Sequence, residues 1–135
     1  MAMTPPLRVA PALAPAPPAA ARPIRPRDEF VTAWLLLMLD GGAGYGYELR
    51  RRLEAQSISI DSAVVYRTLR RLENEGLVRS HWTESVVGPR RRSYKLSASG
   101  TRELDDVAGT IRSLRDLHDR FLGAHDHALA KRRRR

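Results

Sequence analysis

The segment that most constrains the fold is residues 62–78, SAVVYRTLRRLENEGLV. At 100° per residue, Val65, Leu69 and Leu72 fall on one side of a helix. Asp61 or Ser62 is a suitable N-cap, and Gly76 supplies a left-handed stop. The segment is therefore predicted to be a short helix held by its apolar side. Its outer side and flanks carry Ala63, Tyr66, Arg67, Arg70, Arg71 and Asn74.

Two more helices are predicted before this one. The first begins at the N-cap candidate Asp28, ends at Gly41-Gly42, and has an apolar face of Phe30, Val31, Trp34, Leu35 and Met38. The second covers residues 44–55 and has an inner stripe of Tyr45, Leu49 and Leu53. Because the second helix closely precedes the third, the pair resembles a helix-turn-helix.

A basic hairpin is predicted after the three helices. Residues 77–83 and 92–96 alternate in polarity as strands do, and Gly88-Pro89 between them signals a turn. Arg90, Arg91 and Arg92 stand where the hairpin starts its return. In a winged helix, the third helix enters the major groove and the hairpin, or wing, reaches along the DNA backbone. The predicted fold is mainly α with a small β-hairpin, a winged helix-turn-helix domain over residues 28–97.

A last helix is predicted from residue 98 to about residue 122, with Ser97 as its N-cap. Apolar positions at alternating steps of three and four form a heptad seam of Leu104, Val107, Ile111, Leu114, His118 and Phe121. We expect residues 98–123 to act as a C-terminal dimerisation helix, assisted by Leu117 and Leu122. The alternative is a helix that packs on its own domain alone. His118 is expected to be a hydrogen-bonded polar group in the seam rather than a pH-sensitive element.

Both ends of the chain are expected to be disordered. Residues 1–27 contain eight of the nine prolines and no acidic residue, so they are predicted to form a Pro/Ala/Arg-rich arm. Residues 124–135 end in a run of five basic side chains and are predicted to form a disordered basic tail. Such a tail raises nonspecific affinity for nucleic acid.

Composition narrows the function. The net charge of +9 and the pI near 11.1 favour a polyanionic partner. The chain has no cysteine, which excludes disulfides and thiolate zinc sites and suits a cytoplasmic protein. No cysteine nucleophile, phosphate-binding glycine loop or paired carboxylates in an apolar setting are found, so no enzyme is predicted. We expect no cofactor, no metal at His125-Asp126-His127, and no membrane span.

Three stretches of this sequence resemble the PadR family of bacterial transcriptional regulators. They are Gly46-Tyr47-Glu48-Leu49, residues 65–78 (VYRTLRRLENEGLV) and residues 88–97 (GPRRRSYKLS). The resemblance implies a winged helix that dimerises through C-terminal helices; most members are repressors, and many respond to small ligands. Two departures are that Tyr45 replaces a usual His, and that Ser62-Ala63-Val64 stands where members often have Pro-Gly-Thr.

The predicted function is a sequence-specific DNA-binding transcriptional regulator. It is expected to be a homodimeric repressor that binds double-stranded DNA at a palindromic operator and is modulated by a small-molecule effector. Tyr66 either donates to a phosphate or packs beside the wing, whereas Trp34 and Trp82 are expected in the core. The predicted DNA-binding residues are Ser62, Ala63, Val64, Tyr66, Arg67, Arg70, Arg71, Arg90, Arg91 and Arg92.

Two alternatives remain open from the sequence. One is an architectural protein that coats DNA without sequence choice, using its basic arm and tail. The other is a signalling module whose arginines bind an anionic small molecule such as a nucleotide second messenger. Equal binding to random DNA would favour the first alternative, and tight binding of an anionic ligand by the DNA-free protein would favour the second.

Overall fold

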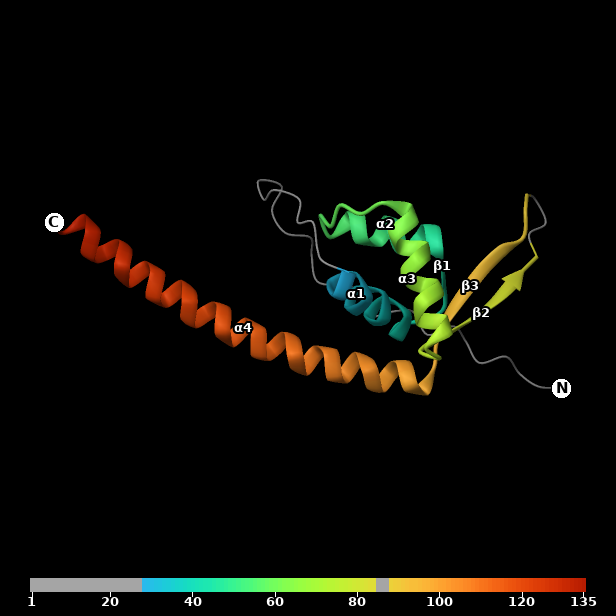
Figure 1. The fold of residues 1–135 in the computed structure, drawn as a ribbon. Coiled ribbons are helices and arrows are strands. Elements are labelled where there is room, and N and C mark those ends of the chain that lie inside the picture. The colour runs from blue at the N-terminus through green and yellow to red at the C-terminus, as the bar shows by residue number, and fades with distance from the viewer. Residues whose placement is uncertain (1–27, 85–87) are drawn as a thin grey trace. The chain divides into compact units, whose positions relative to one another are not determined.

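The computed structural model describes residues 28–84 and 88–135, so the predicted arm over residues 1–27 lies outside the described residues. Two compact units meet between Leu104 and Asp105. The described elements are, in chain order (Figure 1), α1 (Asp28–Asp40), β1 (Gly44–Tyr45), α2 (Gly46–Ala55), α3 (Ser62–Asn74), β2 (Val78–Thr83), β3 (Arg91–Leu96) and α4 (Ala98–Arg133). The predicted fold class, mainly helical with a small wing sheet, is confirmed.

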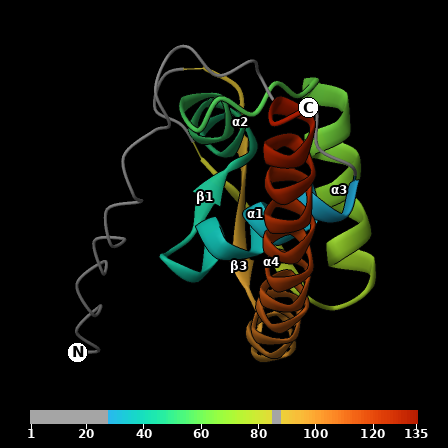
Figure 2. The same cartoon turned by 90° about the vertical axis from the view of Figure 1, so that its left-hand side faces the viewer.

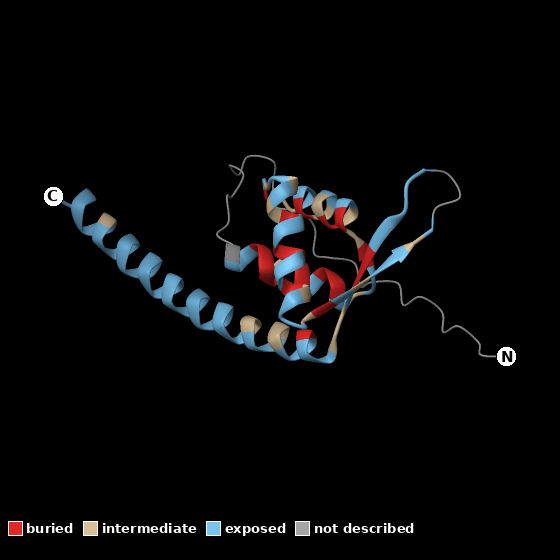
Figure 3. Cartoon of the chain, turned by 45° about the vertical axis from the view of Figure 1, so that its right-hand side comes forward, coloured by how far each residue is buried: buried red, intermediate tan, exposed pale blue. Residues whose placement is uncertain are grey.

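Helix α1 forms the centre of the core in the first unit. It ends at Asp40, ahead of Gly41-Gly42, as predicted. Its buried residues include Val31, Leu35, Leu36, Met38 and Leu39 (Figure 3). The placement of Phe30 in this face was wrong, because its side chain is 42% exposed. The buried arc is centred on Leu35 and Leu39, and at 100° per residue Phe30 falls on the opposite side of the helix.

The predicted start of the second helix was also wrong. Gly44 and Tyr45 form strand β1, which pairs antiparallel with Tyr94 and Ser93 of β3, and α2 begins only at Gly46. A two-residue strand is too short to show an alternating pattern in the sequence. Leu49 and Leu53 are buried as predicted, whereas Tyr45 is half-buried in the strand.

Helix α3 follows the prediction from start to end. The carboxylate of Asp61 caps it by accepting a hydrogen bond from the backbone N–H of Ala63 at 3.1 Å. Gly76 has φ of 75°, the left-handed conformation expected after the helix end. The inner face buries four side chains: Val65, Thr68, Leu69 and Leu72.

The three strands form an antiparallel sheet in the order β1-β3-β2 (Figures 1 and 2). Strands β2 and β3 pair from Val78 opposite Leu96 to Thr83 opposite Arg91. Val78 and Tyr94 join the helical core, while most residues nearer the turn are exposed (Figure 3). The hairpin is therefore fixed at its base and presents its outer half to solvent.

The first turn of α4 is joined to the base of the hairpin. Ser97 is the N-cap, as predicted, because its hydroxyl oxygen accepts from the N–H of Gly100 at 3.0 Å. The same hydroxyl lies 2.7 Å from the carbonyl oxygen of Gly76 and 3.0 Å from that of Leu77. A Cβ at Gly100 would lie 2.1 Å from the Leu77 carbonyl oxygen, so only glycine fits here.

Helix α4 continues to Arg133, so its predicted end near residue 122 was wrong. Residues 124–133, which we expected to be disordered, are helical. They contain neither proline nor glycine and are rich in Ala, Leu, Lys and Arg, which are strong helix formers. No helix in the described part of the chain has the length and apolar character needed to cross a membrane.

The second unit consists of the rest of α4 from Asp105. Several large apolar side chains along it are exposed: Ile111, Leu114, Leu117, Phe121 and Leu122. Phe121 is 66% exposed, and its ring stacks on that of His125 with centroids 6.4 Å apart. Within residues 28–84 and 88–135, no three His, Cys, Asp or Glu side chains gather as a metal site would require.

Candidate nucleic-acid interface

The outer face of α3 carries two exposed arginines, Arg67 and Arg70. Ala63, Arg67, Arg70 and Asn74 are all exposed, as predicted. In the described part of the chain, neither Arg67 nor Arg70 forms a hydrogen bond or an ion pair. Because the opposite face is buried in the core, these two guanidinium groups are presented to solvent from a fixed helix.

Arg71, on the flank of α3, differs from these two. Its guanidinium donates to Glu75 at 3.1 Å and to the hydroxyl of Thr32 in α1 at 2.5 Å. The bond to Thr32 connects α3 to α1. The predicted contact between Arg71 and DNA remains a prediction, but this residue already has a role within the protein.

Arg92 of the hairpin is likewise bound to α3. Its Nη2 donates to both carboxylate oxygens of Glu73, at 3.2 and 2.9 Å, and its Nε donates to Ser80 at 2.8 Å. The Ser80 hydroxyl in turn donates to Glu73. This network, which we call the Glu73–Arg92–Ser80 triad, ties both wing strands to the end of α3. Sequence reasoning placed Arg92 in the DNA interface and did not find the triad.

Arg91 and Arg90 are held less tightly than Arg92. Arg91 donates to the hydroxyl of Tyr47 at 2.9 Å and lies 5.3 Å from the centre of that ring. The ring of Tyr47 stacks on that of Tyr45, with centroids 5.9 Å apart. Arg90 has one acidic partner, Glu84, at 4.0 Å. Both guanidinium groups remain exposed and therefore accessible to an anion.

The placement of Trp82 in the core was wrong, since its side chain is 56% exposed. Its indole lies 5.7 Å from the Arg92 guanidinium and 6.0 Å from that of Arg90. The strand alternation identified the strand correctly, but the hairpin extends beyond the core, so an inward-facing position has nothing to pack on. Trp82 stands opposite Arg92 across the hairpin, a pairing that the structure sets and the sequence pattern does not show. Trp34 packs against the core, as expected.

Tyr66 packs on the start of α2. A Cβ at Gly46 would lie 2.4 Å from Cε1 of Tyr66, so the absence of a side chain at Gly46 makes room for the ring. The ring is 43% exposed, and its hydroxyl has no hydrogen-bond partner among the described residues. Donation to a phosphate therefore remains a prediction.

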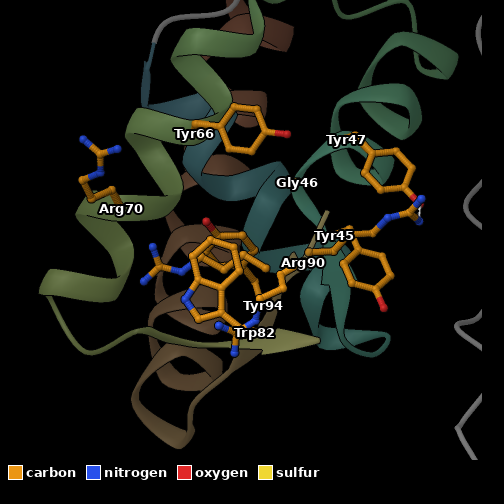
Figure 4. A pocket seen from close by; sticks show the side chains of 10 residues that line it. Tyr45, Gly46, Tyr47, Tyr66, Arg70, Trp82, Arg90 and Tyr94 are labelled. Carbon is orange, nitrogen blue, oxygen red and sulfur yellow. Dashed lines mark hydrogen bonds between the residues drawn. The ribbon is translucent and has the colours of Figure 1, made fainter. Parts of the chain in front are cut away.

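A cavity of about 370 Å³ lies among α3, the start of α2 and the hairpin (Figure 4). Tyr66 and Arg70 reach it from α3, and Trp82, Arg90 and Tyr94 reach it from the hairpin. Burial raises the pKa of Tyr94 above its ordinary value, although the charge of Arg92 opposes this shift. Five aromatic side chains and four arginines line the cavity. Its surface therefore combines ring faces with positive charge.

Of the predicted DNA-binding residues, the structure brings most to one region of the first unit. Tyr66, Arg70 and the three wing arginines line the cavity, and Arg67 is exposed on the same helix. The three residues at the start of α3 differ in solvent exposure: Ala63 is exposed, while Ser62 and Val64 are half-buried. The backbone oxygen of Val64 accepts from the Thr68 hydroxyl at 2.7 Å.

The chain is similar to several solved PadR regulators. One from Eggerthella lenta is 29% identical, with a TM-score of 0.63 over 68% of this chain and 80% of its own. Bacillus subtilis PadR, solved in complex with operator DNA, is 25% identical, with a TM-score of 0.54 over 57% of this chain and 45% of its own. One from Clostridium difficile R20291 is 23% identical, with a TM-score of 0.64 over 69% of this chain and 98% of its own; it supports the fold alone.

No curated protein sequence matches the chain. A model of the transcriptional regulator PadR-like family, however, matches residues 35–106, which is more than half of the 135 residues. This match is to a family of transcriptional regulators rather than of enzymes, and the matched region contains α3, the wing and the first turn of α4. The chain belongs to the transcriptional regulator PadR-like family.

Proposed function

We propose that this transcriptional regulator binds double-stranded DNA with α3 in the major groove and the β2–β3 hairpin along the backbone. The observation that carries the proposal is the outer face of α3, where Arg67 and Arg70 are exposed and form no hydrogen bond or ion pair with the described residues. The wing arginines lie on the same unit. Bacillus subtilis PadR has been solved with operator DNA, and its similarity to this chain supports the proposal.

The arginines divide into two roles in this proposal. Arg67 and Arg70 face base edges, where a guanidinium binds O6 and N7 of guanine with two hydrogen bonds. Arg90 and Arg91 contact phosphates, which requires charge and not a fixed base. Arg92 holds the wing in place through Glu73, and its contact with DNA is secondary.

The proposed active form is a homodimer on a palindromic operator. The seam predicted in α4 supports this, because Ile111, Leu114 and Phe121 are exposed apolar side chains at heptad spacing. A two-fold partner would cover them and would repeat α3 about 34 Å away, one turn of the duplex. A regulator bound at such an operator would exclude other proteins from the promoter, so we propose that it acts as a repressor. We further propose that a small ligand lowers its affinity for DNA.

Genome-wide mapping of bound DNA, followed by footprinting on the strongest site, tests the sequence-specific reading. We expect a short palindrome protected on one face of the duplex. Arg67→Ala should cost about 1–3 kcal/mol on that site and relax preference at one base position. Arg102→Ala, which removes the same charge from α4, is the matched control. Equal affinity for the mapped site and for random duplex would instead favour the architectural alternative, which the net charge of +9 supports.

The dimer is tested separately by sedimentation of the full chain. Ile111→Asp places a charge in the seam and should convert the dimer to a monomer. Ser113→Asp adds the same charge to a nearby exposed position on the opposite side of the helix and should leave the dimer intact. A wild-type protein that sediments as a monomer at micromolar concentration would contradict this part of the proposal.

A further inference from the structure

We propose that the cavity between α3 and the hairpin binds a nucleoside monophosphate, and that bound nucleotide and DNA exclude each other. The exclusion rests on the proposed function, because the arginines of the cavity are also the proposed DNA contacts. The binding of the nucleotide does not depend on it and can be measured without DNA.

The charge of the cavity suits a phosphate. Arg70 has no acidic partner among the described residues, Arg91 is held by the uncharged Tyr47, and Arg90 has a distant partner at 4.0 Å. The fourth arginine, Arg92, is neutralised by Glu73 at 2.9 Å. Among the described residues, three of the arginines that line the cavity thus have no close carboxylate partner. Arginine binds the oxygens of a phosphate through pairs of parallel hydrogen bonds, so a dianionic group fits better than a single carboxylate.

The aromatic residues of the cavity suit a base. Tyr66 is 43% exposed, and on the α2 side its ring faces Gly46, which has no side chain, so ring surface is left open to a ligand (Figure 4). Aromatic side chains stack on nucleobases because both present flat π surfaces. In the proposed complex the base lies on Tyr66, while Tyr47 and Trp82 hold the arginines that bind the phosphate.

The size of the cavity limits the ligand. Its volume of about 370 Å³ is near the lower end of the range of small-molecule sites, which is about 300–1,000 Å³. Such a space accommodates one base, one sugar and one phosphate. The proposed ligand is therefore a mononucleotide.

Isothermal titration of the DNA-free full chain with AMP and with GMP tests the site, and inorganic phosphate is the probe that lacks a ring. We expect at least one nucleotide to bind more tightly than phosphate does. Tyr66→Leu should weaken nucleotide binding about ten-fold, as loss of one stacking contact does, and should leave phosphate binding unchanged. Arg70→Ala should weaken both. Absence of nucleotide binding at millimolar concentration, or equal affinity for nucleotide and phosphate, would overturn the proposal.

Arg67→Ala provides a matched comparison, since it removes the same charge from the same helix but lies outside the cavity. It should leave nucleotide affinity unchanged and weaken DNA binding. Equal losses of nucleotide affinity in Arg67→Ala and Arg70→Ala would mean general charge attraction and would overturn the site. Gly46→Ala gives a second probe if Tyr66→Leu fails to fold, because its methyl group displaces the Tyr66 ring and should also weaken nucleotide binding.

Competition is measured by titrating nucleotide into the complex with the mapped operator duplex. The apparent Kd for DNA should rise linearly with the concentration of free nucleotide. Nucleotide binding without any change in DNA affinity would overturn the exclusion. Nucleotide binding by a protein that binds no DNA would contradict the proposed function and leave the nucleotide site standing, so the two failures are distinguishable.

Discussion

Replacing Glu73 by Gln should destabilise the wing measurably. The carboxylate accepts two hydrogen bonds from Arg92, at 3.2 and 2.9 Å, and one from Ser80. Glutamine keeps one acceptor oxygen and turns an NH₂ group toward the guanidinium, so it loses the ionic attraction and at least one hydrogen bond. Among the described residues, this substitution removes the only ion pair between β3 and α3.

The magnitude follows from the exposure of the pair. The side chains of Arg92 and Glu73 are 40% and 28% exposed, so the pair lies between a solvated and a buried ion pair. Solvated pairs contribute about 0.2–1 kcal/mol, and breaking buried pairs costs about 3–5 kcal/mol. We therefore expect a loss of about 1–2 kcal/mol in the free energy of unfolding. In a domain of this size, each kcal/mol lowers Tm by about 4–8 °C.

Circular dichroism melts at one fixed protein concentration measure this loss, with Glu75→Gln as the control. Glu75 lies on the same helix end, and its mutation removes the same charge, but its pair with Arg71 is 47% exposed on both sides and connects no wing strand. Its loss should cost about 0.3–0.5 kcal/mol. If the two variants have the same Tm, or if a double-mutant cycle between Glu73 and Arg92 gives no coupling energy, the reasoning about the triad is refuted.

Three further changes have defined outcomes. Gly100→Ala places a methyl group 2.1 Å from the Leu77 carbonyl oxygen and should lower the free energy of unfolding by about 3 kcal/mol. Gly109→Ala meets no atom within 4 Å and should raise it by about 0.5–1 kcal/mol. Chemical denaturation of both variants and of the wild type measures these changes. Arg91→Ala should weaken binding to all duplexes alike and flatten the salt dependence by about one unit of slope in titrations at several salt concentrations. The raised pKa of Tyr94 means that the unfolded chain releases this proton first, so stability should fall as pH rises above about 10, and denaturation of Tyr94→Phe should lack this component.

The helices of the first unit were predictable because burial imposes a period on the sequence. In α3, Asp61 caps the helix, apolar side chains form a stripe along one side, and Gly76 follows the helix end. Each of these signals depends on residues that are close together in the sequence. Strand β1 was missed because its two residues gain their structure from pairing with β3, which no local pattern records. The end of α4 was misplaced because a run of basic residues was taken as disorder although its helix propensity is high.

The candidate interface was predictable in its location but not in its internal contacts. The exposed side of α3 followed from helical spacing alone. Arg92 pairs with Glu73, whereas Arg70 has no acidic partner in the part of the chain that the structure describes. This difference depends on the distance between the hairpin and α3, which is a tertiary property. The exposure of Trp82 depends likewise on how far the hairpin extends past the core, and periodicity cannot report it.

Ser97 links the end of α3, the base of the hairpin and the first turn of α4 through hydrogen bonds. Its hydroxyl reaches the two carbonyl oxygens that follow α3 and also caps α4, while its own N–H donates to Leu77 at 3.0 Å. A torque applied to the first turn of α4 must therefore either carry the chain after α3 with it or break these bonds. Ser97 therefore couples the first turn of α4 to the root of the wing through both its hydroxyl and its backbone N–H.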